Sequence, residues 1–283
     1  MIRMRASLLC LCLLVAFSSS AFAAQTAMSD TGEQTRSVTP EALYAGLLVN
    51  AEKGDVQAML ALGSLYEQGV GTARNYTSAL GVYEKAAFAG SPDGYFRLGI
   101  CYEIGMGAPA DMTKAAANYQ KAAEMGLPQA QHKMASLYFT GRGLPKDEKQ
   151  GFALLTQAAE FGDPQAANEF AYVHLKGLFG QNENPVAARE WFGKSAAKGH
   201  LEAMKNLAVM LKDGIGGKTD PEAALRWYLI AQKGGLQAGD FQKTIDDVKS
   251  KLKPVQVKKA EQEADAWLAA FTTKNESTFR QTP

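Results

Sequence analysis

Cysteine, histidine and long apolar runs are scarce in this sequence, and each scarcity excludes a class of site. The 283 residues include 3 cysteines and 3 histidines, and the histidines are scattered at positions 132, 174 and 200. A metal site needs such ligands at defined spacing, so we expect none. The sequence also lacks a G-x-x-x-x-G-K-S/T loop, a G-x-S-x-G elbow and an S-x-x-K motif. We therefore predict no enzymatic activity and no cofactor.

A strong charge of either sign is also absent. Lysine and arginine together number 30, against 29 aspartate and glutamate residues. This balance argues against nucleic acid, or an anionic membrane surface, as a partner held by bulk electrostatic attraction.

The first residues, "MIRMRASLLCLCLLVAFSSSAFAAQ", have the parts of a secretory signal peptide. Arg3 and Arg5 precede an apolar run over 8–17, and small residues end in an A-x-A site at 21–23. The run is shorter than the roughly 20 residues that span a bilayer, so an uncleaved anchor is the less favoured alternative. We expect 1–23 to be a signal peptide that directs the chain to the periplasm or outside the cell, with no stable membrane insertion after cleavage. The polar residues 24–38 are expected to be a disordered leader.

Two sets of glycines recur every 36 or 37 residues, a period typical of a solenoid of helix pairs. Each glycine falls where a helix is expected to end with positive φ, which glycine adopts without steric cost. The first set is Gly69, Gly105, Gly141, Gly177 and Gly214. The second set is Gly54, Gly90, Gly126, Gly162, Gly199 and Gly235.

The segment before each glycine of the first set, which we name helix A, has apolar residues at i, i+4 and i+7, the spacing of one helix face. The segment before each later glycine, helix B, pairs a small residue with a large one. The small residues of helix A are Ala58, Gly94, Ala130, Ala166 and Ala203. The helix B pairs are Ala79 and Tyr83, Ala115 and Tyr119, Gly151 and Leu155, Ala188 and Phe192, and Ala224 and Tyr228. Residues suited to the N-cap, each followed by proline, are Ser91, Asp163, Asn184 and Asp220.

Cys101 is the one cysteine that signal cleavage would leave, so no internal disulfide is expected. It shares its helix A position with Leu65, Leu137, Val173 and Met210. We expect a small buried core residue, with a reactive thiol as the alternative.

Both ends of the repeat region have the pattern of capping helices. Residues 39–54, with Thr39 as N-cap, form a half-repeat, and 237–272 contain two amphipathic helices broken near Pro254. Residues 273–283 are expected to be a flexible tail. Membrane-surface binding by the lysine-rich cap is the alternative, although acids such as Asp246 and Glu261 interleave its lysines.

These motifs resemble the Sel-1-like repeat family, as in "AMLALGSLYEQGVG" with "SALGVYEKAAFAG" and "GYFRLGICYEIGMG" with "KAAANYQKAAEMG". The resemblance implies an all-α fold, a right-handed α/α superhelical solenoid with N- and C-terminal capping helices. Its five helix-pair repeats would cover 55–90, 91–126, 127–162, 163–199 and 200–235. The fourth departs from the pattern, because Phe179 stands where Gly71, Gly107 and Gly143 stand, so a different loop is expected. Some cysteine-rich relatives have been assigned β-lactam binding or hydrolysis, but they carry a disulfide in each repeat, and this activity does not transfer.

The helix A positions that the core does not use form a second stripe, which the resemblance places on a concave, partner-binding face. Phe96, Ile100 and Ile104 form an apolar strip there, either exposed for binding or packed against the next helix. The further candidate groove residues are His132, Asn168, Tyr172 and Lys176.

The function expected from these observations is a non-enzymatic periplasmic or secreted scaffold that binds a protein or peptide segment of the cell envelope. The alternatives are binding of a cell-wall ligand such as peptidoglycan or a β-lactam, an activity associated with a hydrolase, and a secreted factor that contacts a host protein.

Overall fold

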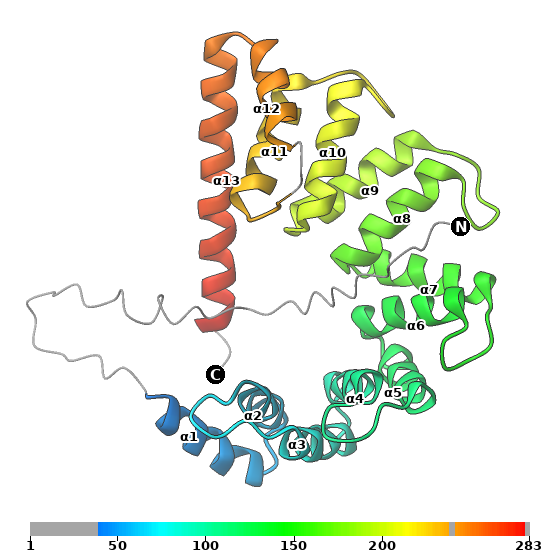
Figure 1. The fold of residues 1–283 in the computed structure, drawn as a ribbon, viewed down its shortest axis with the longest axis vertical. Coiled ribbons are helices and arrows are strands. Elements are labelled where there is room, and N and C mark those ends of the chain that lie inside the picture. Colours follow the sequence, from blue (N-terminus) through cyan, green and yellow to red (C-terminus); the bar gives the residue numbers. More distant parts are fainter. Residues whose placement is uncertain (1–38, 238–240, 281–283) are drawn as a thin grey trace, which may run out of the picture. The chain divides into compact units, whose positions relative to one another are not determined.

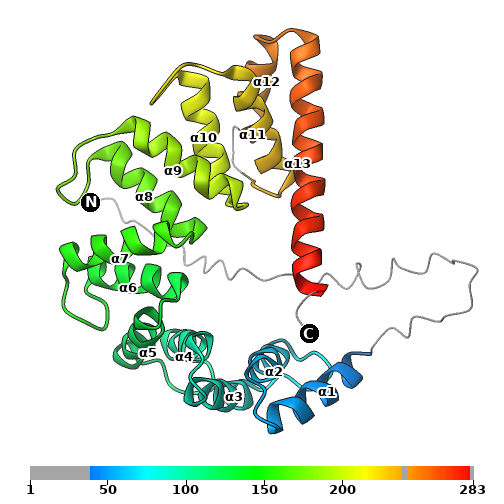
Figure 2. The same ribbon diagram turned by 180° about the vertical axis from the view of Figure 1, so that it is seen from behind.

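The computed structural model of this chain describes residues 39–237 and 241–280, and in these ranges it contains thirteen helices and no strand. The helices belong to one compact unit that begins at Thr39, and Figures 1 and 2 show them following one another in chain order. Their bounds are α1 (Pro40–Glu52), α2 (Val56–Gln68), α3 (Tyr76–Phe88), α4 (Pro92–Ile104), α5 (Met112–Glu124), α6 (Pro128–Thr140), α7 (Glu148–Glu160), α8 (Pro164–Lys176), α9 (Pro185–Ala197), α10 (Leu201–Asp213), α11 (Pro221–Lys233), α12 (Phe241–Ser250) and α13 (Pro254–Arg280).

Ten of these helices, α2 to α11, form five A–B pairs of 13-residue helices. From α1 to α11, each helix packs against the one before it and the one after it in sequence. Helices this short are marginal in isolation, so packing between neighbours supplies most of their stability. The prediction of an all-α helical-repeat solenoid is confirmed.

The helix starts agree with the capping residues expected from the sequence. The side chain of each predicted N-cap residue accepts a hydrogen bond from a backbone N–H of the first turn, at Thr39, Ser91, Asp163, Asn184 and Asp220. Leu127 has no such side chain, and α6 begins without a side-chain cap. Five further caps were not anticipated, and four of them are at Asp55, Asn75, Asp111 and Asp147. The fifth is a histidine. Nδ1 of His200 accepts a hydrogen bond from Ala203 N at 3.1 Å and caps α10.

All eleven recurring glycines have positive φ, as predicted. In four repeats, a further glycine two residues after the one that ends helix A has a second role. A β-carbon on Gly107 would overlap the carbonyl oxygen of Tyr76, the first residue of the preceding B helix. The same close approach joins Gly71 to Pro40, Gly143 to Met112, and Gly216 to Pro185. At these glycines the loops therefore approach the main chain of the preceding helix closely.

The fourth repeat lacks this glycine contact, so the expected difference in its loop is present. Phe179 has φ of 53°, in the left-handed region that a bulky residue rarely adopts. Its ring stacks on Phe139 of α6, with centroids 4.2 Å apart. A side-chain stack between repeats therefore occurs where the other loops have a backbone contact.

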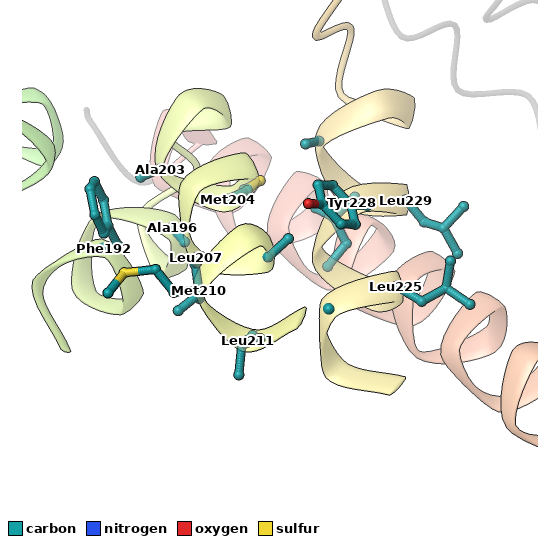
Figure 3. Close-up of a cluster of buried hydrophobic side chains, with 14 of the residues drawn as sticks. Phe192, Ala196, Ala203, Met204, Leu207, Met210, Leu211, Leu225, Tyr228 and Leu229 are labelled. Carbon is teal, nitrogen blue, oxygen red and sulfur yellow. The ribbon is translucent and has the colours of Figure 1, made fainter. Parts of the chain in front are cut away.

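The core follows the predicted small and large positions. Tyr83, Tyr119 and Tyr228 are fully buried, and the ring of Tyr83 lies so close to Gly63 that no β-carbon would fit there. Figure 3 shows the cluster at the last repeats, where Phe192, Met204 and Tyr228 from three successive helices fill the space between them. Cys101 is also completely buried, as its position predicted.

Two helices follow the last repeat, and the second is longer than the sequence indicated. Helix α13 continues to Arg280, so residues 273–280 of the expected flexible tail belong to this helix. It packs along α11, and Glu222 and Arg226 of α11 pair with Lys259 and Glu263 of α13 at 2.6 and 2.7 Å. Glu261 of α13 pairs with Lys249 of α12 at 2.7 Å, so acids and lysines of the cap also pair with one another.

The predicted signal peptide and leader, residues 1–38, lie outside the described residues. In the part of the chain that the structure describes, no helix is long and apolar enough to cross a membrane.

Candidate partner-binding surface

The apolar strip predicted on α4 is divided by the packing of the next repeat. Phe96 and Ile100 are half-buried and pack against the cluster of α5 and α6, where the ring of Phe96 lies 5.5 Å from that of Tyr119. Ile104, at the end of the helix, is 49% exposed. Only Ile104 of the three is therefore largely available to a partner.

Two of the predicted polar groove residues are buried, which corrects their placement on an open surface. His132 and Asn168 are 8% and 9% exposed. Nε2 of His132 lies 3.0 Å from a carboxylate oxygen of Glu169, although not in hydrogen-bond alignment, and Asn168 accepts a hydrogen bond from the side-chain amide of Asn206 at 3.2 Å. In both cases the fifth residue of one A helix faces the sixth residue of the next. These side chains therefore join neighbouring A helices.

The remaining two predicted residues are exposed on α8. Tyr172 is 39% exposed, and its ring meets the edge of Phe192 with centroids 5.1 Å apart. Lys176 is exposed one turn further along. Ser136 and Thr140, at the equivalent positions of α6, are exposed as well. We name Ile104, Ser136, Thr140, Tyr172 and Lys176 the A-helix strip.

Beneath this surface, buried tyrosines link helices A and B of the first two repeats. The hydroxyl of Tyr83 donates to Glu67 at 2.9 Å, and that of Tyr119 donates to Glu103 at 2.6 Å. Lys133 of the following repeat lies 3.3 Å from the same Glu103 carboxylate. Burial, with the Glu67 carboxylate as a second cause, raises the pKa of Tyr83 well above its usual range. Sequence inspection found the tyrosines as core residues but missed their acceptors, which recur at the twelfth position of helix A.

Burial shifts the pKa values of one cysteine and two histidines among the described residues. Burial, reinforced by Glu67, raises the pKa of Cys101 to about 12, so the thiol stays protonated and unreactive near neutral pH. Burial also lowers the pKa values of His174 and His200. Within the described ranges, no group of three His, Cys, Asp or Glu side chains could hold a metal ion.

The helix pairs coincide with a known repeat. The Sel1 repeat profile matches five times, at residues 56–91, 92–127, 128–163, 164–200 and 201–235. The chain belongs to the Sel1 repeat family. Sel1 repeats form a scaffold that typically mediates protein interactions, and the family is generally non-enzymatic.

Solved structures of similar chains are Sel1-like solenoids. A Sel1 repeat protein from Oxalobacter formigenes is 27% identical with a TM-score of 0.67, over 72% of this chain and 58% of that one. A protective antigen of uropathogenic Escherichia coli, c5321, is 21% identical with a TM-score of 0.50, over 87% of this chain and 60% of that one. The immunity protein Pa5087 from Pseudomonas aeruginosa is 20% identical with a TM-score of 0.51, over 74% and 81%.

The chain thus spans about three fifths of the first two structures. The likeness to the two structures below 25% identity shows a common fold. No protein with a curated description matches the chain.

Proposed function

We propose that this Sel1 repeat protein is a non-enzymatic scaffold of the periplasm or cell exterior, and that it binds a segment of a partner protein along the A-helix strip. The observation that carries this proposal is the exposure of Ile104 and Tyr172 on the same type of helix in two repeats. Large apolar side chains in such positions are typical of protein interaction surfaces.

The strip suggests which chemistry the partner segment presents. Ile104 and Tyr172 would take apolar side chains, and the ammonium group of Lys176 would attract a carboxylate. Ser136 lies on α6, which is the A helix between that of Ile104 and that of Tyr172, and its hydroxyl could form a hydrogen bond with the segment. The segment we expect is therefore apolar at two points, with an acidic residue near the Lys176 end.

The experiment is site-specific photocrosslinking in the living cell. A photoreactive amino acid replaces Tyr172 or Ile104 in turn, and it replaces Val186 as the matched control. Val186 is 56% exposed but lies on a B helix, α9. We expect the same crosslinked partner from the two strip positions and none from Val186. Equal crosslinking at all three positions, or none at the strip, would refute the binding surface.

A Tyr172→Ala/Ile104→Asp double variant tests the affinity of the same surface. Both side chains are partly exposed, so we expect an unchanged helical circular dichroism spectrum and loss of the crosslinked partner's co-purification. Retained binding by the folded variant would contradict the proposal. The proposed location is tested separately, by following the chain in an osmotic-shock fraction, in culture supernatant and in cytoplasm.

A further inference from the structure

Helix α1 is an apolar helix that the described fold covers on one side, where it packs against α2. Its sequence, PEALYAGLLVNAE, has two charged residues in 13, yet none of its residues is buried. Leu43 and Val49 are 43% and 48% exposed. A helix that is apolar on all sides is normally covered on all sides.

The repeats show which cover is missing. The approach of Gly71 to Pro40 matches that of Gly107 to Tyr76, so α1 corresponds to a B helix such as α3. Ala79 and Tyr83 of α3 are buried under its own A helix, α2. The residues of α1 at these two positions are Leu43 and Leu47, and no described helix precedes α1 in the chain. Figures 1 and 2 both show α1 at one end of the series.

The uncovered face is suited to packing against itself. The uncovered face spans about 100° around the helix axis, at 100° per residue, and consists of Leu43, Gly46, Leu47 and Asn50. Both acids of α1 lie on the opposite side of the helix. Gly46 has no atom within 4 Å of where its β-carbon would be. Two antiparallel copies could therefore pack the leucine ridge of each α1 beside the glycine of the other, with no acid in the contact.

Residues 24–38, the part of the N-terminus that the proposed signal cleavage would leave ahead of α1, are a poor alternative cover. Residues 24–38, AQTAMSDTGEQTRSV, contain two large apolar residues, Met28 and Val38, ten positions apart. They cannot supply the i, i+4, i+7 apolar face with which an A helix covers a B helix.

We propose that the face of α1 formed by Leu43, Gly46, Leu47 and Asn50 is a self-association site, at which a second copy of this chain supplies the missing helix. The interface is isologous, with α1 antiparallel to α1 of the other copy. A 13-residue helix is about 20 Å long, so the buried area falls well below the roughly 800 Å² per partner of a standard interface. The dimer is therefore weak and depends on concentration.

Sedimentation velocity of the purified chain, from about 1 µM to about 1 mM, tests this proposal over the affinity range of weak interfaces. We expect the weight-average mass to rise toward twice that of the monomer. Leu43→Glu should abolish the rise, because it places a charge in the apolar contact. Val255→Glu is the matched control, since Val255 is 70% exposed on α13 and its variant should behave as the unmodified chain. A constant monomer mass, or a Leu43→Glu variant that still associates, would overturn the proposal.

Disulfide trapping gives an independent readout for a weak contact. In an antiparallel pair centred near residue 46, a Gly46→Cys variant made in a Cys10→Ser/Cys12→Ser background brings the two new thiols together, whereas Cys101 is buried and does not interfere. Mild oxidation should give a covalent dimer from Gly46→Cys and none from Val255→Cys. A disulfide between Gly46→Cys and a different protein would overturn the proposal in favour of a foreign helix on α1.

Discussion

The close approach of each loop to the preceding B helix can be isolated with two alanine substitutions. Gly107 and Gly126 have similar backbone geometry, with φ of 76° and 86°. They differ in surroundings: a β-carbon on Gly107 would overlap the carbonyl oxygen of Tyr76, whereas one on Gly126 would meet no atom within 4 Å. Gly126→Ala therefore measures the cost of the left-handed backbone alone, and Gly107→Ala adds the clash.

The expected magnitudes follow from this difference. Placing alanine in the left-handed region costs about 1–2 kcal/mol, which should be the whole effect of Gly126→Ala. Gly107→Ala also forces a backbone shift of the kind seen in overpacked cores, about 1–3 kcal/mol more. The free energy of unfolding should therefore fall by about 2–5 kcal/mol for Gly107→Ala.

The assay is urea unfolding followed by far-UV circular dichroism, with both variants compared with the unmodified chain at the same slope m. Because repeat arrays can unfold in steps, hydrogen exchange at α3 and α4 locates the destabilised repeats. If the free energies of unfolding of the two variants differ by less than about 0.5 kcal/mol, the close approach of Gly107 to Tyr76 does not contribute to stability.

Three further predictions use equilibrium unfolding. Burial lowers the pKa of His200 in the folded chain, so the unfolded chain binds a proton at a higher pH than the folded chain does. The hydrogen bond that His200 accepts as N-cap therefore contributes fully to stability above the unfolded pKa of about 6.5. This contribution is lost as the pH falls below that value. Asparagine at position 200 can cap the helix but does not titrate, so His200→Asn should make stability less sensitive to acid. If the urea midpoint of the variant depends on pH as that of the unmodified chain does, this prediction is wrong. Tyr119→Phe should lower the free energy of unfolding by about 1–2 kcal/mol through loss of the buried hydrogen bond to Glu103, and a neutral effect would show that the hydroxyl contributes nothing. Lys259→Glu should lower the melting temperature by opposing Glu222, and the loss should shrink in high salt; a salt-independent loss would point to packing.

Much of the fold could be predicted because its determinants are local. A glycine at a left-handed helix end, an aspartate before proline and an alanine at the helix contact each have a steric or hydrogen-bonding reason that the linear sequence carries. The burial of Cys101 followed in the same way, from the residues that share its position in the other repeats. The solenoid was therefore predictable before any contact between repeats was known.

The candidate surface was less predictable because it depends on the angle between successive A helices. Helical periodicity puts Phe96, Ile104 and His132 on the same stripe, but the next repeat covers Phe96 and His132 and leaves Ile104 largely exposed. Whether a side chain at the fifth position is covered depends on the residue that the next helix presents to it. The extension of α13 past residue 272 was missed for a related reason, since TTKNESTFR has no apolar face to indicate a packed helix.

Phe179 adds a side-chain stack to the contact between the third and fourth repeats. In the other four repeats, the residue at this loop position is a glycine that lies close to the main chain of the preceding B helix. Truncating one side chain would therefore remove the Phe179 contact, whereas a substitution at any of the four glycines can only add atoms to a space that is already filled.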